Sequence, residues 1–505
     1  MKRNFLNSIE ISEYNSIKHL LIEFAVPNGE YGSGLTLLVG SNSSGKTSVI
    51  EMLDLVNNMS QRGRMATLSH FFNNSHGSLY GKKFSLKFFI NNKIFQLKRD
   101  DKVIDIHGEL HQVPIDDKNI VVSADKSWAL DIYITDAHRY ITNKTRGIIG
   151  TIANSRETYV RMFQSERIAK KTIGHNKHDI GIMNEKYPDD YPNAIPYEER
   201  VGIRMHAICA KLDDFNIYYS EITNCQISLE LNKQSANHYL LTCNGIPIET
   251  TGDGIVNLIC VIDAIYDSSP GDIIVIDEPE RSLHPIWQKK LSIILGELSK
   301  DRQIIIATHS PYFIDWSSLV NKGKLWRMHQ TEKGISADCL SENSIGIITN
   351  IISDSCNVHV LGLESKEIFF LQDEIILVEG QDDALLYPKI SKQIGLKLKG
   401  NIFGWGVGGA EKMAKIVKIL MDLGYQKVFG ILDGDKNELM AKLNNKYKTQ
   451  YKFAIIPAKD VRDKKPTKKT DATEGLTEKS ELKDKYKSKI TDLFNEIDNY
   501  FTSIG

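Results

Sequence analysis

A glycine-rich turn between an apolar run and a predicted helix constrains the fold of this chain more than any other feature. The apolar run is Gly34-Leu-Thr-Leu-Leu-Val-Gly40, and the turn continues as Gly40-Ser-Asn-Ser-Ser-Gly45-Lys46-Thr47. Glycines let such a backbone curl, so that its N–H groups and the start of the next helix face one place. A buried strand, a tight turn and a helix in this order predict an α/β fold.

The turn fits the pattern G-x-x-x-x-G-K-[ST] of a phosphate loop and lies in the strand–turn–helix context that the motif requires. In such a loop the lysine reaches the β- and γ-phosphate oxygens of a nucleotide, and the threonine hydroxyl ligates Mg²⁺. The loop therefore predicts an ATP site with the binding residues Asn42, Gly45, Lys46, Thr47 and Ser48.

A second apolar run ends in carboxylates. In Asp272-Ile-Ile-Val-Ile-Asp277-Glu278-Pro279-Glu280, two acids stand at the carboxyl end of a predicted strand, where α/β sheets bind ligands. We expect Asp277 to orient Mg²⁺ and Glu278 to polarise the attacking water. The run Ile304-Ile-Ile-Ala307 and an amphipathic helix around 286–298 complete a predicted right-handed βαβ unit.

Two further acidic strand ends occur in the last third of the chain. Glu379 follows Ile375-Ile-Leu-Val378, with Asp383 about one helical turn beyond it, and Asp433 and Asp435 follow Phe429-Gly-Ile-Leu432. Like charges held close together repel unless a cation lies between them, so these four acids predict a divalent-metal site. Oxygen ligands favour Mg²⁺ or Mn²⁺, which can activate water against a phosphodiester.

Length and composition limit the remaining choices. A chain of 505 residues exceeds one ordinary core, which predicts two or three domains. No run reaches the roughly 18 apolar residues that cross a bilayer, and Glu10, Glu13 and Lys18 interrupt any secretory signal. The six cysteines are spread singly, so we expect a cytoplasmic protein without a zinc site or a disulfide framework.

The formal net charge of −1 gives no bulk attraction for nucleic acid, so any DNA-binding surface must be a local patch. The candidate patch is a basic stretch near the C-terminus, which reads equally well as a solvated loop and helix face. Its members are Lys459, Arg462, Lys464, Lys465, Lys468, Lys469, Lys483, Lys485, Lys487 and Lys489.

The first half resembles ABC-type ATPases of the SMC-like branch. Thr250-Thr251-Gly252-Asp253-Gly254 is similar to their signature loop, and Ile305-Ile-Ala-Thr-His309-Ser310-Pro311 is similar to the segment of their switch histidine. The resemblance implies a homodimer or larger homo-oligomer in which Thr251 and Gly252 close on ATP held by another protomer. The loop departs from the usual Leu-Ser-Gly-Gly form, which leaves the rate of hydrolysis open.

The second half resembles the Toprim domain, whose motif is a Glu after one strand and Asp-x-Asp after another. An ABC ATPase followed by Toprim is similar to the OLD (overcoming lysogenization defect) family of ATP-dependent endonucleases. Glu379, Asp383, Asp433 and Asp435 match that family's metal positions, with Asp383 in place of the more frequent Glu. We expect an ATPase domain over 1–365, with a helical insertion at about 145–220, and a Toprim nuclease domain over 366–505.

The resemblance implies an ATP-regulated DNA endonuclease or nickase that acts in bacterial anti-phage defence, with a partner protein or retron nucleic acid as further partners. One alternative is an SMC-like regulatory ATPase whose Toprim domain only binds nucleic acid or a partner. A primase or topoisomerase is a weaker alternative, because their tyrosine-bearing and zinc-binding modules are not visible. The sequence does not identify a catalytic lysine, for which Lys464, Lys479 and Lys487 are candidates. It also does not assign a role to Arg139.

Overall fold

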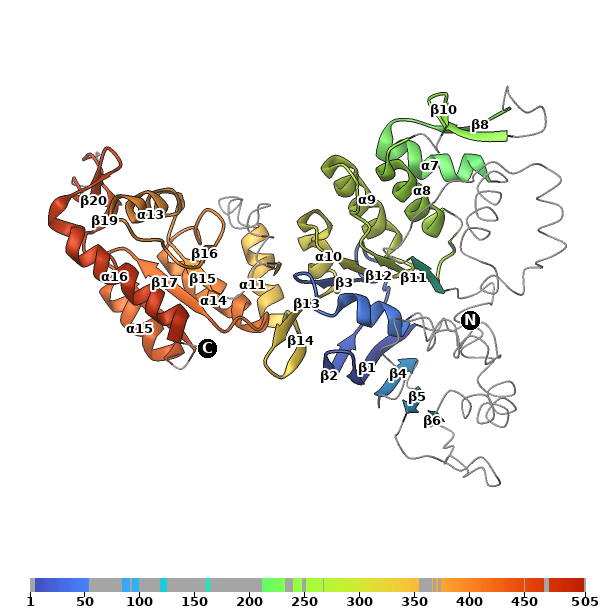
Figure 1. Cartoon of the computed structure of the whole chain (residues 1–505), viewed down its shortest axis with the longest axis horizontal. Helices are drawn as coiled ribbons and strands as arrows, with labels where there is room; N and C mark the ends of the chain where they lie inside the picture. The colour runs from blue at the N-terminus through green and yellow to red at the C-terminus, as the bar shows by residue number, and fades with distance from the viewer. Residues whose placement is uncertain are drawn as a thin grey trace. The chain divides into compact units, whose positions relative to one another are not determined.

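The computed structural model divides the chain into two units, whose helices and strands are labelled in Figure 1. The first unit comprises Met1–Leu38 and Asn42–Ser336, and the second comprises Val39–Ser41 and Ala337–Gly505. The predicted boundary at 365/366 adjoins an undescribed stretch and stays a prediction. The structure describes residues 5–53, 84–90, 93–99, 119–124, 160–163, 211–231, 239–247, 251–266, 268–353, 366, 369–370, 374–448, 450–466 and 472–503.

A six-stranded sheet forms the centre of the first unit, in the order β14-β13-β3-β12-β11-β7. Every residue of β3, β11 and β12 is buried, which explains why their sequences are apolar without alternation. β11 and β12 pair in parallel on either side of α9 (Pro285–Leu298), which confirms the predicted βαβ unit. The strands are β3 (Leu35–Val39), β7 (Val160–Phe163), β11 (Ile273–Asp277), β12 (Gln303–Thr308), β13 (Lys324–Thr331) and β14 (Gly334–Cys339).

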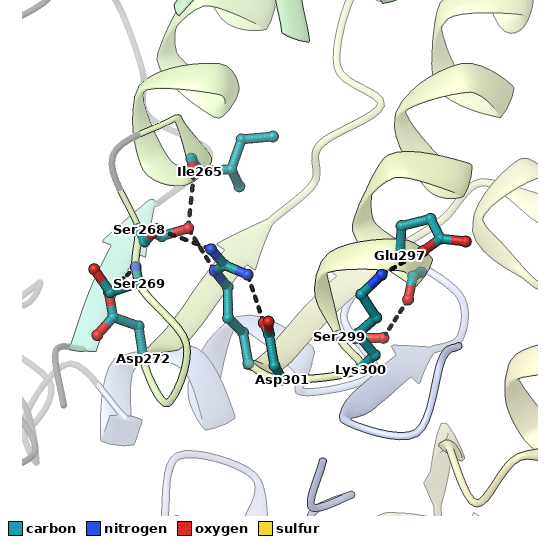
Figure 2. Close-up of polar contacts among 10 residues, drawn as sticks. Ile265, Ser268, Ser269, Asp272, Glu297, Ser299, Lys300 and Asp301 are labelled. Atoms are coloured by element: carbon teal, nitrogen blue, oxygen red, sulfur yellow. Dashed lines mark hydrogen bonds and ion pairs between the residues drawn. The ribbon is translucent and has the colours of Figure 1, made fainter. Parts of the chain in front are cut away.

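A polar cluster fixes the amino ends of β11 and β12 (Figure 2). The Arg302 guanidinium donates to Ser268 Oγ at 2.8 Å and to the Ser268 carbonyl at 2.9 Å. Ser268 in turn donates to the carbonyl of Ile265, the last residue of α8 (Asp253–Ile265), while the Ser269 N–H donates to Asp272. These bonds hold the end of α8 and the starts of β11 and β12 together. Ligands of an α/β sheet bind at the opposite, carboxyl ends of the strands.

Two smaller sheets belong to the same unit: a mixed sheet in the order β2-β1-β4-β5-β6 and an antiparallel sheet in the order β10-β9-β8. In the mixed sheet, β4 (Phe84–Ile90) and β5 (Lys93–Arg99) pair as an antiparallel hairpin. Most of the predicted insertion at 145–220 lies outside the described residues; within it Val160–Phe163 is a strand rather than a helix, and α7 (Leu212–Thr223) is helical. The other strands are β1 (Leu6–Tyr14), β2 (Ile17–Glu23), β6 (Asn119–Ala124), β8 (Ile227–Leu231), β9 (Tyr239–Cys243) and β10 (Ile246–Pro247).

The second unit is built on a four-stranded parallel sheet in the order β16-β15-β17-β18. Its core joins β15 and β17 to α13 and α16, for example through the edge-to-face contact of Tyr387 with Phe494 at 6.3 Å. This α/β arrangement confirms the predicted second α/β domain. The strands are β15 (Ile375–Leu377), β16 (Asn401–Ile402), β17 (Val428–Leu432), β18 (Tyr451–Ile455), β19 (Asp460–Arg462), β20 (Gly475–Glu478) and β21 (Glu481–Leu482).

Helices α13 and α14 follow strands β15 and β16 along the chain. A short 3₁₀ turn (Ala410–Lys412) precedes α14. None of the helices among the described residues is long and apolar enough to cross a membrane. The helices are α11 (Glu342–Ser353), α13 (Gln381–Gln393), α14 (Met413–Asp422), α15 (Asn437–Tyr447) and α16 (Asp484–Ser503).

Candidate active sites

The phosphate loop Gly40–Thr47 follows directly on β3, and a helix begins at Lys46. Gly45 has φ 90°, a conformation that L side chains rarely adopt. A Cβ at Gly45 would also lie 2.5 Å from Ile335 Cδ1, so no other residue fits here without a shift. The tight turn expected from the sequence is thus imposed both by backbone conformation and by packing.

The side chain of Lys46, the lysine expected to bind the nucleotide phosphates, is only 5% exposed. Its Nζ donates to Ser44 Oγ at 3.2 Å and lies 3.5 Å from His309 Nδ1. Burial lowers the pKa of Lys46 to about 8, against the opposing influence of Asp277 and other nearby carboxylates. The ammonium therefore stands in a poorly solvated place, where a triphosphate would stabilise its charged form.

This pKa predicts a pH-dependent nucleotide affinity. The phosphates of ATP favour the charged ammonium and raise the pKa of Lys46 in the complex. When Lys46 of the free protein is deprotonated, ATP binding must therefore be accompanied by uptake of a proton. ATP affinity should be constant below about pH 8 and fall above it, by at most about tenfold per pH unit. Calorimetric titration with ATP between pH 7 and 10 measures this dependence. Lys46→Arg stays charged, so its ATP affinity should not fall with pH. A wild-type affinity that is independent of pH would contradict the account.

The carboxylates after β11 gather beside this lysine. Asp277 is 1% exposed at the strand end, and the Glu278 N–H donates to the Ala307 carbonyl at 2.8 Å. Glu278 has φ 46°, and its Oε1 lies 3.5 Å from His309 Nε2. The structure thus places the His309 ring between the Lys46 ammonium and the Glu278 carboxylate.

Glu280 is a residue whose role the sequence alone did not reveal. Its Oε1 accepts from the His309 N–H at 2.6 Å, and its Oε2 accepts from Thr308 Oγ1 at 2.8 Å. Burial raises the pKa of Glu280 despite these donors. The Glu280 carboxylate fixes the backbone at His309. The sequence feature that could have pointed to Glu280 is its place in the same acidic run as Asp277.

The other predicted nucleotide residues lie around the loop. Asn42 and Thr47 are exposed, and Ser48 Oγ accepts from Asn15 Nδ2 at 3.1 Å. Gly252 is the N-cap of α8, directly after Thr251. Ser48 and Thr251 are partly exposed, Gly252 is exposed, and Arg139 lies outside the described residues.

In the second unit, the Glu379 side chain links the ends of two neighbouring strands by a hydrogen bond. β15 and β17 run parallel, and the Asp433 N–H just beyond β17 donates to Glu379 Oε1 at 2.7 Å. Asp433 Oδ1 is buried and has no hydrogen-bond partner among the described residues. Two residues 54 positions apart in sequence therefore meet at one edge of the sheet.

The remaining two predicted acids are placed differently. Asp383 is 5% exposed and accepts from the Gly380 N–H at 2.8 Å, which caps α13 beside Glu379. Asp435 is exposed and forms an ion pair with Lys436 at 3.2 Å. Asp433 and Asp435 would share a face if the strand continued through them, but β17 ends at Leu432, so the alternation of a strand does not extend to these residues.

Asp460, the first residue of β19, was not among the predicted site residues. It is 6% exposed and forms an ion pair with Lys464. Burial is the main reason why the pKa of Glu379, Asp383 and Asp433 is raised, and the Asp460 charge adds to the rise. Lys464 opposes the rise in the pKa of Asp433, which distinguishes it from the other two lysines considered. A lone Asp within a basic stretch gave no motif to identify it.

The electrostatics of this edge favour a cation. Burial first, and then neighbouring carboxylates, raise the pKa of Asp433 to about 8; burial, partly offset by the Gly380 N–H, raises the pKa of Asp383 to about 7. Oxygen donors and a buried unpartnered Asp433 oxygen suit a hard divalent ion. Within the described residues, however, no three or more acids, histidines or cysteines are grouped closely enough to hold one.

Gly434 gives this edge its shape. Its N–H donates to the Ala458 carbonyl at 2.9 Å, and a Cβ there would lie 2.2 Å from the same oxygen. Gly434→Ala should therefore destabilise the second unit by about 1–3 kcal/mol, measured by thermal unfolding. Gly346→Ala, at an exposed position of α11 with nothing within 4 Å of the new Cβ, is the matched control; equal melting temperatures for the two variants would refute the packing argument.

Acidic neighbours balance much of the predicted basic patch. Arg462 pairs with Asp382 at 2.7 Å and Lys483 with Asp463 at 2.6 Å, while Lys485 pairs with Glu474. A nucleic-acid backbone would have to compete with these ion pairs. Lys468 and Lys469 lie outside the described residues.

Two family models match parts of the chain. Residues 243–315 match AAA_21, described as "AAA domain, putative AbiEii toxin, Type IV TA system". Residues 370–435 match OLD-like_TOPRIM, "Overcoming lysogenization defect protein-like, TOPRIM domain". The chain therefore carries an ATPase domain followed by an OLD-like TOPRIM domain, while among curated proteins no relative is found.

Solved structures that resemble the chain include three SMC heads. An SmcHead bound to the C-winged helix domain of ScpA is 14% identical, covers 67% of this chain and 98% of its own, and has a TM-score of 0.33. The Pyrococcus furiosus Smc head with an extended coiled coil, bound to the C-terminal domain of ScpA, is 12% identical over 70% and 100%, with a TM-score of 0.38. The Thermotoga maritima SMC head domain is 14% identical over 66% and 99%, at 0.31.

Proposed function

We propose that this pairing of an ATPase domain with an OLD-like TOPRIM domain makes a divalent-metal-dependent DNA endonuclease or nickase that nucleotide regulates. The observation that carries the proposal is the contact of Glu379 with the Asp433 N–H, beside a buried Asp433 oxygen that has no hydrogen-bond partner among the described residues. Burial and then the Glu379 charge raise the pKa of Asp433, and a cation bound by both carboxylates would offset their repulsion.

In this proposal Glu379 and Asp433 would hold the ion, with Asp383 and Asp460 adding negative charge behind them. A bound Mg²⁺ or Mn²⁺ supplies charge neutralisation and an activated water. Glu379 also orients the Asp433 backbone, and Asp383 orients the start of α13. Asp435, which now pairs with Lys436, would have to leave this partner to join the site.

Lys464 is the lysine that we assign to the phosphodiester. It is the candidate whose charge acts on Asp433, and its ion pair with Asp460 positions it. Since a phosphate oxygen competes with a carboxylate for an ammonium, Lys464 could pass from Asp460 to the substrate. This role would make it a stabiliser of the negative charge that develops during cleavage.

In the first domain, Lys46 and Thr47 would bind ATP and Mg²⁺ together with Asp277, while Glu278 would orient the attacking water and His309 would contact the γ-phosphate. The place of the His309 ring between Lys46 and Glu278 supports these assignments. A second protomer would supply Thr251 and Gly252, which makes the protein a homodimer or larger homo-oligomer. Anti-phage defence in the cytoplasm, with a defence partner protein or a retron nucleic acid, is the setting that the OLD-like domain suggests.

The experiment that tests the function is cleavage of supercoiled plasmid with Mg²⁺ or Mn²⁺. Nicked or linear product should form with wild type and be lost with Glu379→Gln. Product formation that is equal for wild type and Glu379→Gln would show that another site or a contaminant cuts the DNA.

A second candidate function is a regulatory ATPase whose TOPRIM domain binds nucleic acid or a partner without cutting. The exposure of Asp435, and the lack of a three-acid metal group among the described residues, favour it. A purified chain that hydrolyses ATP and binds DNA, yet never cuts it with any divalent ion, would establish this alternative.

A further inference from the structure

Ile335 contacts the phosphate loop from strand β14. Its side chain is 7% exposed, and its Cδ1 and Cγ2 would lie 2.5 and 3.0 Å from a Cβ built on Gly45. The Ile335 N–H donates to the Ser16 carbonyl at 3.0 Å, which fixes this end of the strand. A change in the backbone of Gly45 on nucleotide binding would therefore press on Ile335 or release it.

The strand that carries Ile335 leads directly out of the first unit. β14 spans Gly334–Cys339, and the division between the two units falls inside it, after Ser336. The segment from Ile335 to Ser341 reads Ile-Ser-Ala-Asp-Cys-Leu-Ser, with no glycine or proline. Five residues, 336 to 340, thus separate the phosphate loop's neighbour Ile335 from Ser341 along the chain.

Ser341 is bonded to the C-terminal end of α14. Its N–H donates to Asp422 Oδ2 at 3.0 Å, and its hydroxyl donates to the same oxygen. Ser341 Oγ also accepts from the Ser344 N–H, so the same residue starts α11. One carboxylate therefore ties the chain that leaves the first unit to a helix of the TOPRIM domain.

The opposite end of α14 reaches the acidic residues. The Gly409 N–H, just before the 3₁₀ turn that precedes α14, donates to the Glu379 carbonyl at 2.8 Å. Met413, the first residue of α14, is fully buried, and its Sδ lies 3.0 Å from where a Cβ on Gly430 would stand. Gly430 lies three residues before Asp433, so α14 packs on the strand that leads to Asp433, and the turn just before α14 bonds to Glu379.

We propose that nucleotide binding is transmitted to the acidic site through Ile335, β14, the Ser341–Asp422 hydrogen bonds and α14. The inference rests on the proposed function and names how its two domains are coupled. Ser341 and Asp422 are positioning residues, since neither contacts the phosphate loop nor the acids. Coupling requires that the nucleotide favours one of two placements of this connection, and it acts equally in both directions.

The first test measures how ATP changes plasmid cleavage in Ser341→Ala and Asp422→Asn. Cleavage without ATP and ATP affinity should stay within about twofold of wild type, because the variants touch neither site. The factor by which saturating ATP changes cleavage, expected at about 5- to 150-fold in either direction, should fall toward one. The double variant should lose no more of the ATP effect on cleavage than each single variant does. Asp498→Asn changes an exposed acid on α16 and should keep the wild-type ATP effect.

The second test does not depend on cleavage. Hydrogen exchange of residues 413–422 should change on addition of ATP in wild type and not in Ser341→Ala, Asp422→Asn or Lys46→Ala. A retained ATP effect in both the Ser341 and Asp422 variants, or no ATP effect on these amides in wild type, overturns the coupling. An ATP-dependent change in exchange without any DNA cleavage would leave the coupling standing and refute the nuclease instead.

Discussion

Replacing Asp433 by Asn is expected to lower divalent-ion-dependent DNA cleavage by about 10²- to 10⁴-fold. The substitution keeps the shape of the side chain but removes the charge from an oxygen that is buried and has no partner among the described residues. The measurement is the rate of nicking of supercoiled plasmid at saturating Mg²⁺ or Mn²⁺. ATP hydrolysis, which takes place in the other domain, should not change.

The same variant should not lose stability, which separates chemistry from folding. Because burial raises the pKa of Asp433 to about 8, the folded state binds a proton more tightly than the unfolded chain does. The wild-type free energy of unfolding should therefore decline as pH rises from the usual carboxyl range to about 8, and Asp433→Asn should reduce this decline. Asp498→Asn serves as the exposed control; unchanged nicking by Asp433→Asn would contradict the assignment of the acidic site.

Glu278→Gln is expected to reduce ATP hydrolysis by about 10²- to 10³-fold while ATP still binds. The amide keeps the reach of the side chain toward His309 but cannot accept a proton from the attacking water. Lys46→Ala should instead lose nucleotide binding, because it removes the buried ammonium that faces the phosphates.

Steady-state phosphate release and equilibrium binding of a fluorescent ATP analogue distinguish these two effects. Glu297→Gln, which alters an exposed glutamate on α9, provides the matched control and should behave as wild type. Full hydrolysis by Glu278→Gln would mean that another group activates the water, for which Glu280 is the next candidate.

The sequence predicted those features that depend on local patterns. The phosphate loop, the βαβ unit around α9 and the parallel strands before Glu379 and Asp433 all follow from apolar runs bounded by glycines or acids. These features could be found because a buried parallel strand must be apolar throughout and its ligands must follow it.

Features that depend on contacts between distant segments could not be found in this way. Asp460 acts on Asp433 only because the chain just before β19 bonds to the turn after β17, where the Gly434 N–H donates to the Ala458 carbonyl; nothing in the local sequence marks Asp460. Asp435 was expected beside Asp433, but the strand ends too early to keep the alternation. Ile335 reaches Gly45 only through the folded sheet.

The most direct test of the central claim is the rate of plasmid cleavage as a function of ATP concentration, measured for wild type, Lys46→Ala and Asp433→Asn in parallel. We expect the wild-type rate to change with ATP, the Lys46→Ala rate to stay constant, and Asp433→Asn to show almost no cleavage at any concentration. Cleavage by Asp433→Asn at the wild-type rate, or an ATP response that survives in Lys46→Ala, would contradict a TOPRIM nuclease controlled by its ATPase domain.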